Sequence, residues 1–177
     1  MEHNPLSVPR TREAADEALR TYMDDHLAGS TAALQLVDHL IDTASAPDER
    51  EFFTSLRIDI DDDRQTLEDL MGRFGKSPGT LRNIGGWLVE KAARLKLMLD
   101  DPGDGGLKQL EALEMLVLGI HGKQELWGAL TEVSATVPHL ASADLQRLQR
   151  RADDQHARVE TRRLRAAGRA FGSATIG

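Results

Sequence analysis

Apolar residues recur at intervals of three and four along most of this chain, the spacing that places side chains on one face of an α-helix. The most apolar of these patterns covers 107–133, where a further set of leucines lies beside the main stripe. The stripe is Leu110, Leu113, Val117, Ile120, Gln124, Trp127 and Thr131, and the neighbouring leucines are Leu116, Leu118, Leu126 and Leu130. A helix that is apolar over so wide an arc must be covered on several sides. We therefore expect this segment to be the central helix of the fold.

The six prolines and a glycine-rich linker fall between the helical patterns, and no stretch alternates as a strand would. The patterns predict five helices. These run from a Thr11 cap to Thr43, from about Asp48 to Phe74, from Ser77 to about Leu99, from Leu107 to Val133, and from a Ser142 cap to about Phe171. Four of them are long, about 40 to 50 Å at 1.5 Å per residue. Helices of this length pack best side by side.

The spacing of the long helices indicates their connections. Some thirty residues, about 75–104, separate the second long helix from the third, which is enough chain to travel the length of a bundle. The sequence therefore predicts an all-α four-helix bundle with a long crossover that contains a short extra helix. We expect residues 11–172 to form a single domain, with tails at 1–10 and 173–177.

Composition narrows the class of protein. The 177 residues include no cysteine, which excludes disulfides and thiolate metal sites, and only 4% are aromatic. No apolar run has the length of a membrane span, and the amino terminus lacks the apolar segment of a signal peptide, so we expect a cytoplasmic protein without membrane contact. A net charge of -7 disfavours nucleic acid as a partner. No phosphate-binding loop or hydrolase nucleophile motif is present.

The last helix departs from the acidic balance of the rest of the chain. It carries eight arginines, namely Arg147, Arg150, Arg151, Arg158, Arg162, Arg163, Arg165 and Arg169. These side chains either pair with acidic neighbours of the same chain or contact an acidic protein partner. We also expect a homodimer or larger homo-oligomer, formed through helix faces left apolar by the crossover around 87–97.

Polar residues interrupt the inward faces of the predicted helices near their middles. This inward set contains His26, Asp59, Asp63, His121 and His156, and the further candidate ligands beside it are Asp62 and Asp153. Imidazole and carboxylate groups from facing helices are good ligands for Fe, Mn or Zn, so one interpretation is a metal site. The other interpretation is a buried layer of hydrogen bonds and ion pairs, with histidine against aspartate across the core.

Two hairpins joined by a long crossover resemble the ferritin-like superfamily. Its metal-binding members hold two metal ions with one Glu from each of two helices and a Glu-x-x-His from each of the other two. The corresponding positions here are His26, Asp59-x-x-Asp62, His121 and Asp153-x-x-His156. The replacement of Glu by Asp and His reduces the negative charge of such a site.

Two short strings, Arg64-Gln65-Thr66-Leu67-Glu68 and GIHGKQELW at 119–127, resemble ferritin-like bacterial proteins of unknown function linked with stress responses. The resemblance implies a non-catalytic or weakly metal-binding protein with a degenerate di-metal centre. Two alternatives are a genuine metalloprotein, with a storage or oxidase-type di-metal site, and a purely structural helical interaction module.

Overall fold

The computed structural model describes residues 11–75 and 105–172, and within them the chain is helical with no strand. The four long helices are α1 (Arg12–Thr43), α2 (Pro47–Gly72), α4 (Gly105–Val133) and α5 (Leu145–Phe171), and a single 3-10 turn, Pro138–Leu140, precedes the last of them. These bounds lie within a few residues of those predicted from the sequence. The prediction of an all-α four-helix bundle is confirmed.

Local side-chain bonds explain where two of the helices begin. The hydroxyl of Thr11 accepts a hydrogen bond from the backbone N–H of Ala14 at 3.3 Å, so the predicted cap of α1 is confirmed. The predicted Ser142 cap of α5 is wrong. Asp144 caps this helix by accepting from the backbone N–H of Arg147 at 3.0 Å, while the Ser142 hydroxyl accepts a hydrogen bond from Arg73 at 2.8 Å and ties the turn to the end of α2.

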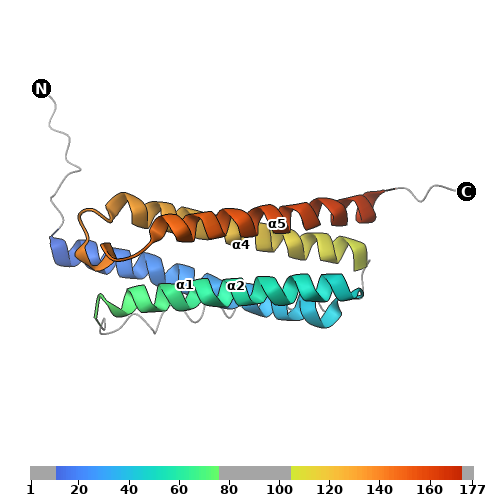
Figure 1. The fold of residues 1–177 in the computed structure, drawn as a ribbon, viewed down its shortest axis with the longest axis horizontal. Helices are drawn as coiled ribbons and strands as arrows, with labels where there is room; N and C mark the ends of the chain where they lie inside the picture. The colour runs from blue at the N-terminus through green and yellow to red at the C-terminus, as the bar shows by residue number, and fades with distance from the viewer. Residues whose placement is uncertain (1–10, 76–104, 173–177) are drawn as a thin grey trace, which may run out of the picture.

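The helices form two antiparallel hairpins, α1 with α2 and α4 with α5, that pack side by side (Figure 1). The closest contacts between the hairpins join α1 to α4, and α2 faces α5. Figure 1 also shows that α2 ends at one end of the bundle and α4 begins at the other. The predicted short helix at 77–99, and the expected oligomer surface around 87–97, lie outside the described residues. No described helix is long and apolar enough to cross a membrane.

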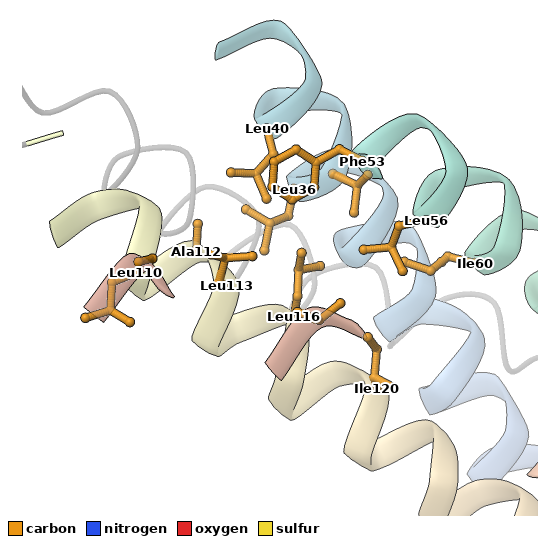
Figure 2. Close-up of a cluster of buried hydrophobic side chains, with 13 residues drawn as sticks. Leu36, Leu40, Phe53, Leu56, Ile60, Leu110, Ala112, Leu113, Leu116 and Ile120 are labelled. Carbon is orange, nitrogen blue, oxygen red and sulfur yellow. The ribbon is translucent and has the colours of Figure 1, made fainter. Parts of the chain in front are cut away.

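The buried apolar side chains fall into two clusters, one in each half of the bundle. The first contains Leu36, Val37, Leu40, Phe53, Leu56, Ile60, Leu110, Ala112, Leu113, Leu116, Ile120, Val159 and Ala166, and Figure 2 shows most of them converging from α1, α2 and α4. The second contains Met23, Leu67, Leu70, Phe74, Leu126, Trp127, Leu130, Leu140, Leu145, Leu148 and Ala152. The middle of the bundle lies between these two clusters.

Buried residues recur along α2 at a regular spacing that continues from the first apolar cluster into the second. On α2 the buried positions alternate in steps of three and four, through Phe53, Leu56, Ile60, Asp63, Leu67 and Leu70. This is the heptad spacing of helices that pack at shallow crossing angles with side chains interlocked. One of these buried residues, Asp63, carries a carboxylate, and it lies where the two apolar clusters meet.

Candidate functional site

Each helix places one polar side chain in the middle of the bundle. These four residues, which we call the polar layer, are His26 of α1, Asp63 of α2, Lys123 of α4 and Gln155 of α5. Each follows a buried apolar residue by three positions, respectively Met23, Ile60, Ile120 and Ala152. The heptad spacing therefore directs all four toward the interior, between the apolar clusters.

Asp63, Lys123 and Gln155 form a closed set of contacts. The ammonium of Lys123 lies 2.7 Å from Asp63 Oδ2 and also donates to the amide oxygen of Gln155. The amide nitrogen of Gln155 donates to the same Asp63 oxygen at 2.8 Å. Asp63 and Gln155 are almost fully buried, with 2% and 1% of their surfaces exposed. Three polar side chains are thus bonded to one another in the apolar interior, while the second carboxylate oxygen of Asp63 makes no hydrogen bond within the described residues.

The ammonium of Lys123 is held between two opposing influences. Burial lowers the pKa of Lys123 from its ordinary value, because an apolar surrounding disfavours the charged form. The carboxylate of Asp63 acts in the opposite direction, through its charge and its hydrogen bond. Arg151 places a second positive group 3.3 Å from the other oxygen of Asp63. The centre of the bundle therefore contains one buried carboxylate with two cations against it.

His26 completes the layer without joining this set of hydrogen bonds. Its ring lies edge-on to that of Tyr22, with the ring centres 4.7 Å apart. Burial lowers the pKa of His26, and the nearby charge of Asp25 opposes this shift. Since the ordinary value is 6.5, the imidazole is neutral at pH 7.

A cavity of about 220 Å³ lies between α1, α2 and α4 at the level of the polar layer. His26, Asp63, Lys123 and Trp127 all contribute to its wall. Apolar side chains and small residues make up most of the remainder, including Ile60, Leu67, Ile120, Leu126, Gly29, Gly119 and Gly122. The cavity is therefore mostly apolar, with a few polar groups, which is the composition of sites that bind small molecules.

Arginines of α5 reach across to acidic residues of α2 outside the polar layer. Arg158 pairs with Asp59, and Arg151 lies 3.6 Å from Asp62. Nearer the end of the bundle, Arg162 lies 3.7 Å from Asp48, and its guanidinium stacks 4.2 Å from the centre of the Phe52 ring. These contacts support the interpretation that the arginines pair with acidic neighbours of the same chain.

The prediction that His121 faces the core is wrong. Its side chain is 59% exposed, with Nδ1 3.1 Å from the amide oxygen of Gln124 and Nε2 3.7 Å from the carboxylate of Glu125. Successive helical residues are separated by about 100°, so the inward position in this turn belongs to Lys123, two residues further on. His121 lies instead on the α4–α5 surface, with its ring centre 6.4 Å from that of His156.

The remaining candidates are distributed over separate parts of the bundle. His26 and Asp63 line the same cavity, as expected from their inward positions. Asp59 and Asp62 pair with arginines of α5, and Asp153 is exposed, accepting from Gln124 at 2.8 Å. His156 is only partly buried. No group of three or more His, Asp or Glu side chains within 11–75 and 105–172 is arranged to hold a metal ion. Metal binding by the seven residues stays a prediction.

Two members of the polar layer, Lys123 and Gln155, were not among the candidates read from the sequence. Both carry a signal that the sequence contains. Lys123 lies three residues after Ile120 and four before Trp127, and Gln155 lies three after Ala152 and four before Val159. Extending the heptad register through α5, instead of selecting metal-ligating residue types, identifies Gln155, whereas on α4 Gln124 fits the spacing as well as Lys123 does.

Three comparisons with known proteins found no relative of this chain. No family model matched the chain, and neither did any curated protein or solved structure.

Proposed function

We propose that this chain is a ferritin-like helical-bundle protein without di-metal catalysis, in which an ion-paired layer replaces the metal centre. One observation carries the proposal. The ammonium of Lys123 lies in the middle of the bundle, 2.7 Å from the carboxylate of Asp63 and within hydrogen-bonding distance of Gln155. The positive charge that metal ions supply in the metal-binding members of that superfamily is here supplied by a lysine side chain.

The donor set at this level also argues against tight metal binding. Asp63 is its one fully buried carboxylate, and one oxygen of Asp63 is already bonded to both Lys123 and Gln155. A divalent ion would have to displace the ammonium or approach it, and like charges repel strongly where water is excluded. His26 is a neutral imidazole and adds a single ligand. The layer is therefore a poor site for Fe, Mn or Zn.

The stress-response assignment forms part of the proposal and depends on the resemblance of the two strings at 64–68 and 119–127. Lys123 belongs to the second string, so the residue that supplies the buried charge lies in one of the two segments that carry the resemblance. The role we propose is therefore that of a non-catalytic bundle, with weak metal binding at most.

Metal analysis and thermal melting test this proposal. The protein, purified without a histidine tag, is melted alone and with Fe(II), Mn(II) or Zn(II), under anaerobic conditions for iron. A metal at a hundred times its dissociation constant adds about 2.7 kcal/mol, which for a chain of this size raises the melting temperature by about 5 to 10 °C. We expect no such rise and no stoichiometric metal.

The contrary result is equally specific. A rise of this size that is lost in Asp63→Asn and in His26→Gln, and that persists in His39→Gln, would show a metal site in the polar layer. His39 is the matched control because it lies on the same helix as His26, near its far end. That outcome would overturn the proposal and favour the metalloprotein alternative.

A further inference from the structure

We propose that the cavity between α1, α2 and α4 is a binding site for a small, uncharged, mostly apolar molecule that carries one hydrogen-bond acceptor, with a simple phenol as its closest chemical class. This inference goes beyond the replacement of a metal centre, because it assigns a ligand to the space beside the polar layer. It depends on the shape of the cavity, on the charges in its wall, and on one unpartnered donor.

The size of the cavity sets the size of the ligand. An apolar cavity of about 150 Å³ inside a protein holds a benzene molecule. The cavity here measures about 220 Å³, so it has room for one ring with one or two substituents. Its apolar wall, which includes Ile60, Leu67 and Leu126, favours a hydrocarbon surface over water.

Glycines create part of this space. A Cβ atom built on Gly29 or Gly119 would meet no other atom within 4 Å, and one built on Gly122 would meet only the ring of His26, at 4.0 Å. All three glycines line the cavity. Glycine lowers helix stability by about 1 kcal/mol relative to alanine, so three cavity-lining glycines in helices are a cost to the fold. Gly29 and Gly119 are exposed, whereas Gly122 is partly buried beside His26, so Gly122 is the one of the three that leaves space inside the bundle.

The charges in the wall indicate that the ligand is uncharged. Asp63 is paired with Lys123, and the partly buried Arg64 is paired with Glu68 at 2.7 Å. The fifth charged or titratable residue of the wall, Asp25, is exposed to solvent. An ionic ligand would lose its hydration without gaining an unpaired buried group of opposite sign, which is unfavourable.

Two buried donors of residues in the wall make no hydrogen bond within the described parts of the chain, the Nε of Arg64 and the indole N–H of Trp127, and only the second belongs to a side chain without an ion pair. Trp127 is 1% exposed, and its indole N–H makes no hydrogen bond within the described parts of the chain. A buried donor that is left without a partner costs free energy, so such groups are rare. Because Trp127 is one of the residues that line the cavity, a bound ligand with an oxygen acceptor would supply the missing bond. A phenol combines this oxygen with a ring of the right size.

Calorimetry with three probes of similar size tests the site in the full-length protein. The probes are p-cresol, toluene and 4-methylbenzoate. We expect p-cresol to bind one site with a dissociation constant below about 1 mM, as its eight non-hydrogen atoms allow. Toluene, which lacks the oxygen, should bind more weakly, and the anion should not bind. No binding of p-cresol at about 5 mM, or tighter binding of the anion, would overturn the proposal.

Two substitutions locate the site. Gly122→Leu fills the cavity from α4 and should abolish binding of p-cresol, whereas Gly128→Leu, on an exposed part of the same helix, should leave it unchanged. Trp127→Phe removes the indole N–H and should weaken p-cresol about fivefold while leaving toluene unchanged. Unaltered p-cresol binding in Gly122→Leu, or an equal loss for both probes in Trp127→Phe, would contradict the assignment. Because no metal is present in these titrations, their outcome is separate from that of the metal test.

Discussion

The buried ion pair between Lys123 and Asp63 makes the replacement of Lys123 by methionine an informative perturbation. Methionine retains most of the length and volume of lysine but removes the ammonium. Asp63, only 2% exposed, then keeps its hydrogen bond from Gln155 at 2.8 Å and the guanidinium of Arg151 at 3.3 Å. The carboxylate loses its closest cation without becoming wholly uncompensated.

The magnitude follows from this geometry. Removing one partner of a buried ion pair costs about 3 to 5 kcal/mol. Because Arg151 remains near Asp63, we expect Lys123→Met to lower the free energy of unfolding by a value near the bottom of that range, about 3 kcal/mol. Urea denaturation followed by circular dichroism measures the change.

A triple substitution separates the cost of an orphaned carboxylate from the value of the layer itself. In Lys123→Met, Asp63→Leu, Gln155→Leu all three mutually bonded groups become apolar. Replacement of a buried polar set by apolar side chains of similar volume is often neutral or stabilising by about 1 to 4 kcal/mol. We therefore expect the triple variant to recover most of the loss seen in Lys123→Met. A single substitution that costs less than about 1 kcal/mol, or a triple variant less stable than the single one, would refute the reasoning.

The surface pair between Arg57 and Asp38 provides the matched control. Its atoms approach to 2.5 Å, as closely as the buried pair, but the two side chains are 39% and 49% exposed. Water and salt screen such a pair, so Arg57→Met should change the free energy of unfolding by less than about 1 kcal/mol. A similar loss at both sites would mean that burial does not determine the strength of the central pair.

Four further substitutions test the core, a helix cap and the pH dependence. Leu113→Ala should cost about 2 to 5 kcal/mol in urea denaturation because Leu113 is 1% exposed in the first apolar cluster, whereas Leu118→Ala, at a side chain 67% exposed, should cost less than about 0.5 kcal/mol. Asp144→Ala removes the cap of α5 and should lower the free energy of unfolding by about 1 kcal/mol. Because burial lowers the pKa of His26, the unfolded chain binds a proton before the folded one does, so stability should fall as the pH drops from about 7.5 through 6.5 toward the folded pKa. His26→Gln should reduce this fall, and an unchanged pH dependence would contradict the assignment.

In the first hairpin the sequence predicted the inward positions of two polar residues, although Asp59 is only partly buried and Asp62 is exposed. On α1 and α2 the apolar residues occupy one clear stripe, so the phase of each helix follows from the pattern, and both His26 and Asp63 were assigned to the interior. The bundle and its long helices required no more than helical spacing and the positions of proline and glycine.

In the second hairpin the sequence did not predict the inward polar residues of α4 and α5, for two different physical reasons. The helix α4 is apolar around most of its circumference, so a stripe through Gln124 and one through Lys123 fit almost equally well from the sequence alone. On α5, the spacing from Ala152 and Val159 indicates Gln155, but an amide is a weaker metal ligand than the carboxylate of Asp153 or the imidazole of His156. Because histidine is the better metal ligand, His121 and His156 were favoured over Lys123 and Gln155, which belong to the polar layer.

The polar layer also affects how the helices align along the bundle axis, because it interrupts a repeating heptad pattern at one level only. A shift of α2 by one heptad, about 10.5 Å along the bundle, would still place apolar residues against apolar residues at most levels. It would, however, carry the carboxylate of Asp63 far beyond bonding distance of Lys123, and a buried charge without its partner costs several kcal/mol. We infer that the layer disfavours the shifted arrangement far more than the apolar clusters do. The polar layer can therefore favour the correct alignment over the shifted one even though it adds little to the stability of the correct fold.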